Sequence, residues 1–275
     1  MEQNALDFTI WQVGFAYIFL LVVLLIVHIK KIPRKKLLII ASLRMTLQLI
    51  IVGYILVYVL DYPNPYITVL IVLIMLAFAV FTVYQRAKHA IKMDLKKMVA
   101  LAMLIGVSLN LLYFMFVILQ LDPWYEPQYF IPISGMIIGK TMTGVSLGIN
   151  NLLTSMKDNQ AKVEGAIMLG ASPKVASKSI INEAFDEAML PTVNAMVGMG
   201  IIFLPGMMTG QIIAGQSPIM AVKYQISVML GVLGTVAVTV LFFLHLAYKI
   251  FFNDRYQFLL TKRDLPKDKL PVKYD

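Results

Sequence analysis

Three carboxylates stand close together just before one of the apolar runs of this chain. Glu183, Asp186 and Glu187 are three and four residues apart, a spacing that places them on one face of a helix. Such a face gathers cations, or it forms ion pairs with Lys174 and Lys178. The residues alone leave both interpretations open.

Further polar side chains lie inside the apolar runs themselves, where they are costly and often functional. Lys140, Asn150, Asn151 and Asn194 are the clearest of these. Lys140 opposes a cationic cargo and suits an anionic one better. Arg44, one helical turn from Gln48, fits a side chain that reaches the headgroups. The roles of Arg44 and Lys140 stay open.

No catalytic or metal motif accompanies these groups. The histidines His28, His89 and His245 form no spaced ligand set, and the chain has no cysteine and no P-loop. Methionine thioethers suit soft metals, but most of the 18 methionines are expected to fill space. We therefore expect no enzyme and no cofactor in this chain, and we assign no metal site, although Met207 and Met208 are exceptions to the packing interpretation.

These residues belong to long apolar elements. Seven runs of roughly 20 residues are long enough to cross a bilayer; they cover about 8–28, 37–60, 66–84, 98–121, 130–153, 191–213 and 219–246. The sequence predicts an all-α, multi-pass protein of the cell membrane with seven transmembrane helices.

Charge fixes the expected orientation. Of the 24 Lys and Arg, 21 lie in the segments 28–36, 84–97, 154–190 and 249–275, and the alternate connections carry none. Because cytoplasmic loops retain Lys and Arg, the N-terminus is expected outside and the basic 249–275 tail in the cytoplasm. The net charge of +9 thus belongs to a membrane protein and does not indicate a nucleic-acid partner.

The segment 154–190 is the one sizeable soluble piece. It is rich in charged residues and is interrupted at Gly170-Ala171-Ser172-Pro173. Glycine can end one helix, serine can cap the next, and proline fits its first turn. We expect two short helices that meet at a bend.

The spacing Glu164, Gly165, Ala166, Gly170 and Ile180 resembles the EAA loop of ABC-transporter permeases. Gly165 replaces the first alanine of that pattern, and no Leu-Pro follows Ile180 at the family's offset. The resemblance implies that Glu164, Gly165, Ala166, Gly170, Ala171 and Ser172 couple the chain to a separate ATPase subunit. That subunit would bind the ATP and Mg²⁺.

Several blocks in the second half resemble the FetB-type permease family, which is related to plant aluminium-tolerance permeases. They include Gly135-Met136-Ile137-Ile138-Gly139, Leu190-Pro191-Thr192-Val193 and Leu204-Pro205-Gly206-Met207-Met208-Thr209-Gly210. The resemblance implies a homodimer of this subunit that works with two copies of an ATPase. It also implies iron as the bacterial cargo and a sugar nucleotide for plant relatives.

The spans 130–153 and 191–213 flank the cytoplasmic helices and are expected to line the route. Gly135, Gly139, Gly144 and Gly148 form small-residue pairs that let helices approach closely. Pro205-Gly206 predicts either a functional break or a rigid kink. The pathway and hinge candidates are Asn150, Asn151, Asn194, Pro205, Gly206, Met207, Met208 and Gly210.

Together these features predict the permease subunit of an ABC exporter, with iron as its cargo. One alternative is an ABC exporter of an anionic metabolite such as a sugar nucleotide. A secondary transporter is the other, although the spans lack the intramembrane acids that ion coupling requires.

Overall fold

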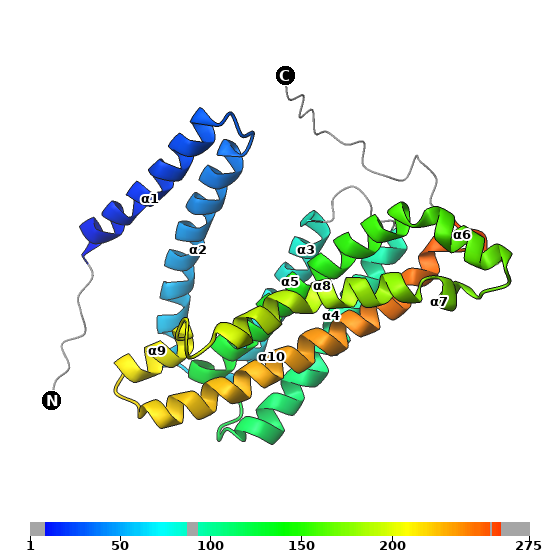
Figure 1. Cartoon of the computed structure of the whole chain (residues 1–275). Coiled ribbons are helices and arrows are strands. Elements are labelled where there is room, and N and C mark those ends of the chain that lie inside the picture. Colours follow the sequence, from blue (N-terminus) through cyan, green and yellow to red (C-terminus); the bar gives the residue numbers. More distant parts are fainter. Residues whose placement is uncertain (1–8, 87–92, 254, 260–275) are drawn as a thin grey trace. The chain divides into compact units, whose positions relative to one another are not determined.

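The structure is a computed structural model that describes residues 9–86, 93–253 and 255–259. The chain divides into two units, residues 1–62 and 63–275, and each is described by itself. The described residues form helices and connections, without an extended strand (Figure 1). This confirms the all-α prediction.

The first unit is a helical hairpin. Helix α1 (Ile10–Ile29) and helix α2 (Lys35–Asp61) are joined by a short basic turn. The hydroxyl groups of Tyr17 and Thr46 are hydrogen bonded across the pair. Within the described part of the unit, Val27 and Val59 are the buried side chains, so the two helices bury little of their apolar surface against each other.

The second unit is a bundle of long helices that lie side by side (Figure 1). They are α3 (Pro65–Arg86), α4 (Met93–Tyr113) with the π-helical turn η1 (Phe114–Leu119), α5 (Pro127–Asp158), α8 (Lys178–Gly198) and α10 (Pro218–Ala247). The core runs along their shared faces. A side chain at Gly231 would collide with the ring of Phe114, at 2.7 Å, which shows how closely α10 approaches η1.

Short helices occupy the two ends of this bundle. Helices α6 (Gln160–Met168) and α7 (Pro173–Ala176) connect α5 to α8. Helix α9 (Gly206–Ile213) lies between α8 and α10 at the opposite end (Figure 1). The turn η2 (Tyr248–Phe251) follows α10.

Six described helices are long and apolar enough to cross a membrane. They correspond to six of the seven predicted spans. The predicted span at 191–213 is wrong in its bounds: α8 begins 13 residues earlier and ends at Gly198, and α9 is a separate helix. Charged residues in the first half of α8 hid its start. The helix ends at Gly198, Met199 is extended, and Gly200 with φ +84° follows before Pro205 is reached.

The connection 154–190 is also shorter than predicted. Helix α5 continues to Asp158 and α8 begins at Lys178, so 159–177 link the two long helices. The bend lies where it was predicted, between Met168 and Pro173. The second helix is not short, because after Ser177 the chain continues directly into α8.

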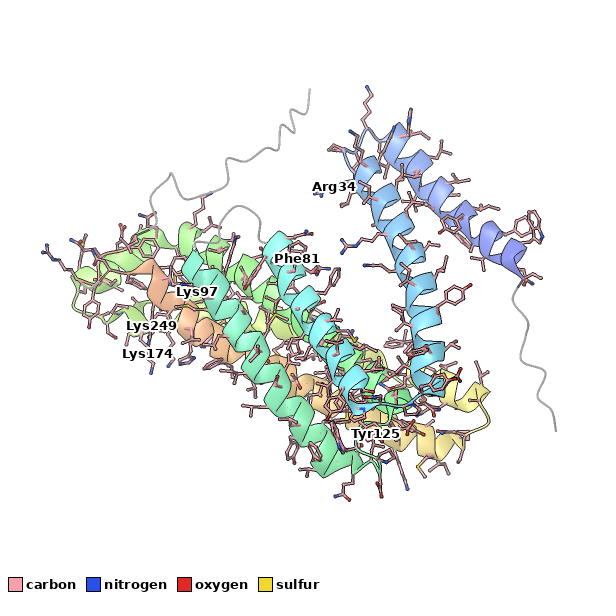
Figure 2. The ribbon with its side chains drawn as sticks, turned by 180° about the vertical axis from the view of Figure 1, so that it is seen from behind. Arg34, Phe81, Lys97, Tyr125, Lys174 and Lys249 are labelled. Atoms are coloured by element: carbon pink, nitrogen blue, oxygen red, sulfur yellow. The ribbon has the colours of Figure 1, made fainter. Side chains whose placement is uncertain are left out.

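Charge and aromatic residues mark opposite ends of the second unit. Lys97, Lys174 and Lys249 lie at one end, and Tyr125 lies at the other (Figure 2). The beginning of the predicted basic tail packs on the bundle, since Phe251 and Phe252 are buried and Leu259 N donates to Phe251 O at 2.8 Å. The remainder of that tail, His89 and residues 1–8 lie outside the described residues.

Candidate transport and coupling sites

Two of the predicted packing glycines lie where α5, α8 and α10 meet. A Cβ atom at Gly144 would stand 2.7 Å from Val236 Cγ1 and 3.2 Å from Ala188 O. One at Gly148 would stand 3.5 Å from Ala188 Cβ and 3.6 Å from Val240 Cγ1. The backbone of α5 therefore touches both neighbours at this level, and α8 packs closely against α5 with no side chain between them.

The other two glycines of the set have different surroundings. A Cβ atom at Gly135 would meet the Met75 methyl group of α3 at 2.9 Å, and one at Gly139 would meet nothing within 4 Å. The four glycines are thus not one interface. They divide between the α8–α10 side, the α3 side and an open position.

Helix α8 keeps one face uncovered along its length. Glu183, Asp186 and Glu187 are exposed on it and line a shallow groove of about 450 Å³ with Ser179, Asn182 and Leu190. Farther along α8, the apolar side chains of Val193 and Val197 are also exposed, at 41% and 74%. Packing against α5 and α10 on one side leaves the acidic residues on the other.

The carboxylates are not neutralised by the neighbouring lysines. None of Glu183, Asp186 and Glu187 forms an ion pair with a described residue, Lys174 and Lys178 included. Within the described ranges, no group of three or more His, Asp or Glu side chains is arranged to hold a metal ion. This face can concentrate cations, and it is not a preformed metal centre.

The acidic face lies beside the second half of the membrane-length helix α5. The carbonyl oxygen of Ala184, beside Glu183, lies 3.7 Å from the position of a Cβ atom at Gly148. Gly148 lies ten residues before the end of the membrane-length helix α5, about 15 Å at 1.5 Å per residue. Ionised groups are costly in hydrocarbon, so wherever this face lies within the bilayer it requires water or a second protein.

The three asparagines predicted along the route do not form one cluster. Asn194 is exposed on α8, six residues beyond Ala188, whereas Asn150 and Asn151 follow Gly148 on α5 in the opposite direction. At 1.5 Å per residue the two positions are about 12 Å apart along the helix axes. Asn151 Oδ1 accepts a hydrogen bond from Ser155 Oγ at 3.3 Å.

The predicted break at Pro205-Gly206 differs from the observed one. The helix ends at Gly198, the chain makes tight turns in which Gly200 N donates to Phe203 O at 2.9 Å, and Pro205 caps the start of α9. Pro205 thus does not kink a continuous helix. The prolines that lie inside helices are Pro132 in α5 and Pro191 in α8.

The predicted pathway residues after the break lie on α9. Met207 and Met208 are half-buried, and Met207 packs against the core. Met207 and Gly210 line a cavity of about 230 Å³ between α9 and the beginning of α5. Met208 is not among the residues that line it.

The predicted coupling residues surround the bend between α6 and α7. Glu164 Oε1 accepts from Gln160 Nε2 at 2.8 Å on α6. The carbonyl groups of Gly165 and Ala166 accept from Leu169 N and Ala171 N, and Gly170 has φ +91°. This arrangement resembles the hydrogen-bonded helix ends that glycine in the left-handed region permits. Ser172 stands at the N-cap of α7, without a side-chain cap bond.

Residues that the sequence reasoning missed protrude from this bend. Met168 and Leu169 are 86% and 91% exposed, and Val175 on α7 is exposed as well. Beneath them Val163, Ser177 and Ile180 are buried, and Ser177 Oγ donates to Pro173 O at 2.6 Å. The small residues of this segment suggested the coupling site, whereas the signal for these positions is the pair of adjacent large apolar residues before Gly170.

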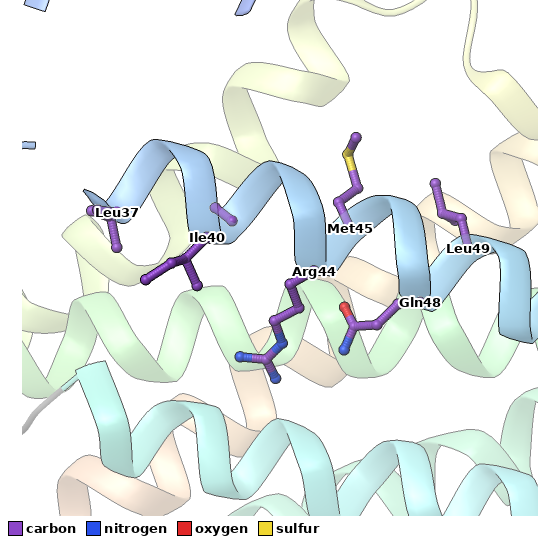
Figure 3. Close-up of a pocket in the computed structure, with 7 residues that line it drawn as sticks. Leu37, Ile40, Arg44, Met45, Gln48 and Leu49 are labelled. Atoms are coloured by element: carbon purple, nitrogen blue, oxygen red, sulfur yellow. The ribbon is translucent and has the colours of Figure 1, made fainter. Parts of the chain in front are cut away.

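Arg44 and Gln48 lie in the first unit. Their side chains project to the same side of α2 (Figure 3), along a shallow groove of about 360 Å³ with Leu37 and Ile40 among its lining. Lys140 is half-buried on α5, and no described carboxylate forms an ion pair with it.

Comparison with known proteins decides the family. Residues 10–252 match the family described as "Uncharacterised protein family (UPF0014)". The chain belongs to the UPF0014 family. It is 33% identical to the probable iron export permease protein FetB of Escherichia coli, over 94% of this chain and 98% of the relative.

Two further UPF0014 relatives extend the comparison. The chain is 36% identical to the UPF0014 membrane protein slr1647 of Synechocystis, over 79% of this chain and 83% of that protein. It is 33% identical to protein ALUMINUM SENSITIVE 3 of Arabidopsis thaliana, over 78% and 77%. No solved structure matches the chain. The resemblance to the FetB-type and plant permeases is confirmed, and the chain is a multi-pass membrane permease of this family.

Proposed function

We propose that this permease is the membrane subunit of an ABC exporter, driven by a separate ATPase that docks on the α6–α7 bend. The observation that carries the proposal is the exposed pair Met168 and Leu169, 86% and 91% accessible. Both lie beyond the end of α5, on the side of the bundle that holds Lys174 (Figure 2). Large apolar side chains exposed to water next to a rigid base indicate a protein partner.

The bend is built to transmit force. The buried Val163, Pro173 and Ser177 fix α6 and α7 to the bundle, and α7 leads through Ser177 into α8. A partner that pulls on Met168 and Leu169 therefore acts on α8 directly. Helix α8 is packed along α5 and α10. Its movement would therefore shift its exposed face, which carries Glu183, Asp186 and Glu187.

A second copy of the chain is the occupant that we assign to the uncovered face of α8. With 21 residues, α8 rises about 31 Å and supplies the seventh crossing of the membrane. Two copies related by an axis along the membrane normal bring Glu183, Asp186 and Glu187 of each into one vestibule. Repulsion between the two acidic faces favours a cation between them.

Iron is the proposed cargo. FetB, the relative from Escherichia coli, is named a probable iron export permease, and the unpaired carboxylates of α8 suit a divalent cation. The face lies toward the end of the bundle with Lys97, Lys174 and Lys249 (Figure 2), which the positive-inside rule places in the cytoplasm. It would collect iron there for export.

Lys140 favours a second candidate, export of an anionic metabolite. This side chain is half-buried within the membrane-length helix α5 and has no ion pair with a described carboxylate. A lone ammonium group on the route would attract an anion and repel Fe²⁺. Replacement of Lys140 by Met separates the candidates, since it should raise iron transport and abolish transport of an anion.

The test is reconstitution of the permease with its ATPase subunit in proteoliposomes. We expect ATP hydrolysis that requires the permease and rises with Fe²⁺, and ATP-dependent accumulation of labelled iron in inverted vesicles. The double variant Met168→Ser, Leu169→Ser should lose both activities. The matched double variant Ile201→Ser, Ile202→Ser, equally exposed at the opposite end, should keep the ATPase associated.

The outcomes separate machine from cargo. Hydrolysis that requires the permease but ignores iron would retain the ABC assignment and favour the anionic cargo. An ATPase that is indifferent to the permease, and to the serine variants, would overturn the coupling assignment and leave a secondary transporter.

A further inference from the structure

The turn between α1 and α2, where Arg34 lies (Figure 2), is the most concentrated basic segment of the chain. All residues from 30 to 36 except Ile32 and Pro33 are Lys or Arg. The side chains exposed among them are Lys30, Lys31, Arg34 and Lys36. No Asp or Glu occurs between residues 9 and 60. The basic turn, residues 30–36, therefore has no carboxylate beside it in the described hairpin.

Hydrogen bonds close this turn and give the cations a defined framework. Ile32 N donates to Val27 O at 3.0 Å, and Lys31 has φ +53°. The side chains of Lys35 and His28 are hydrogen bonded across the turn. Val27 is buried, whereas the cationic groups on either side of it point outward into exposed positions. The basic turn is thus a closed structure that displays its charges together.

Exposed apolar side chains alternate with these cations. Ile29, Ile32 and Leu37 are 66%, 43% and 57% exposed. Helices α1 and α2 are both long and apolar enough to cross a membrane, and residues 30–34 alone separate them, so the turn lies at the headgroups of one leaflet. There the apolar side chains can enter the acyl region while ammonium and guanidinium groups contact phosphate. A small anion in water would satisfy the charges and leave the apolar side chains uncovered.

We infer that the basic turn binds the headgroup of an anionic phospholipid. Clusters of roughly four to eight Lys and Arg directly beside a membrane helix are the pattern that recognises anionic lipids. The exposed cations outnumber the charge of one phosphate, so the turn accommodates one doubly charged headgroup or two singly charged ones. The positive-inside rule assigns this lipid to the cytoplasmic leaflet. The site needs neither the ATPase nor the cargo, and it fixes the α1–α2 hairpin at that leaflet.

Quenching of a local fluorophore by brominated lipids tests this site in the full-length permease. The chain has no native cysteine, so Ile32→Cys carries the fluorophore in the turn. Leu60→Cys, similarly exposed at 45%, carries it near the other end of α2. Nanodiscs hold brominated phosphatidylglycerol or brominated phosphatidylcholine in both leaflets, so the direction of insertion does not affect the result. We expect phosphatidylglycerol to be preferred about tenfold at position 32, and not to be preferred at position 60.

Neutral substitutions in the turn should remove this preference, lowering it about tenfold; they are Lys30→Gln, Lys31→Gln, Arg34→Gln and Lys36→Gln. The matched control changes the net charge equally at exposed lysines around the α6–α7 bend, with Lys157→Gln, Lys162→Gln, Lys174→Gln and Lys178→Gln. It should keep the preference at position 32. The exchange Lys30→Arg with Arg34→Lys conserves charge and should keep it as well, so that a neutral variant that fails to fold does not decide the question. Raised salt should weaken the preference, because the cations are exposed and are screened.

Three results would overturn the lipid site. Equal quenching by the two lipids at position 32 would show that the turn does not select anionic headgroups. Equal losses in the turn variant and the bend variant would show that the preference follows net charge. Displacement of phosphatidylglycerol by inorganic phosphate or glycerol phosphate would replace the lipid by a small anion. A preference found in a permease that stimulates no ATPase would retain the lipid site and refute the exporter.

Discussion

The two ends of helix α8 present the same local feature in different surroundings. Near its start, Met168 and Leu169 are 86% and 91% exposed; beyond its end, Ile201 and Ile202 are 91% and 81% exposed. Each pair lies beside a glycine in the left-handed region, Gly170 at φ +91° or Gly200 at φ +84°. Both ends therefore display apolar side chains on a tight turn.

The two turns lie in different surroundings. Met168 and Leu169 lie at the end with Lys97, Lys174 and Lys249, whereas the second turn lies toward the end with Tyr125 (Figure 2). Lipid can cover apolar side chains at an aromatic interface, but it cannot cover them beyond a lysine-rich end. Under the proposed function, the ATPase covers the exposed side chains at the first turn, and lipid or a second copy covers those at the other.

The largest effect should come from disrupting the packing of α8, the helix that joins the two ends, against α5 and α10. Gly144→Leu would drive a side chain into Val236 Cγ1 and Ala188 O, at 2.7 and 3.2 Å from the Cβ position. Overpacking costs about 1–3 kcal/mol or more, so we expect little folded protein by size-exclusion chromatography. Gly139→Leu, open at Cβ, should give a near-normal yield. Equal yields of the two variants would contradict the close packing of α5 on α8 and α10.

The next effect should distinguish the ends themselves. Leu169→Asp places a charge in the proposed contact with the ATPase, and loss of a central apolar anchor costs about 2 kcal/mol or more. Co-purification of the ATPase subunit should fall at least about thirtyfold. Ile201→Asp should leave that association unchanged.

The opposite result would assign ATPase docking to the other end of the bundle. If Ile201→Asp released the ATPase subunit and Leu169→Asp did not, the lysine-rich end would not be the docking end. Accessibility of single cysteines placed at positions 169 and 201, in a chain with no native cysteine, would then show which end faces the cytoplasm.

Local pattern predicted most of this fold. The apolar runs before 153 and after 219 became helices of nearly the expected bounds, because length and hydropathy are summed over many residues. The bend at 170–173 was predicted because Gly170 and Pro173 impose backbone geometry at single positions.

Helix α8 shows why the rest could not be predicted. Its first half carries Glu183, Asp186 and Glu187, which resemble a soluble segment when read along the sequence, although this half packs on α5 through Ala184 and Ala188. Likewise Gly144 and Gly139 have the same residue type and different neighbours. A one-dimensional pattern contains neither the partner of a face nor its depth.

A smaller effect concerns the charge that α8 holds between its ends. The triple variant Glu183→Gln, Asp186→Asn, Glu187→Gln should lower ATP-driven iron transport at low iron by about tenfold, because a charged vestibule raises local cation concentration by that order or more. Transport at saturating iron and association with the ATPase should change less. Lys174→Gln with Lys178→Gln is the control; an equal loss there would indicate ion pairing between these groups in the assembled transporter.

The smallest effect should come from the two glycines that make the turns comparable. Neither Cβ position meets an atom within 4 Å, so Gly170→Ala and Gly200→Ala differ from the wild type only by backbone strain of about 1–2 kcal/mol. Both should lower the melting temperature to a similar extent. If the ends have the roles assigned to them, Gly170→Ala should also reduce permease-dependent ATP hydrolysis, because strain at that turn moves Leu169. Gly200→Ala should leave hydrolysis intact and lower iron accumulated per ATP. Identical losses of hydrolysis in both variants would mean that the turns report stability alone, and that the distinction between the ends lies in their side chains.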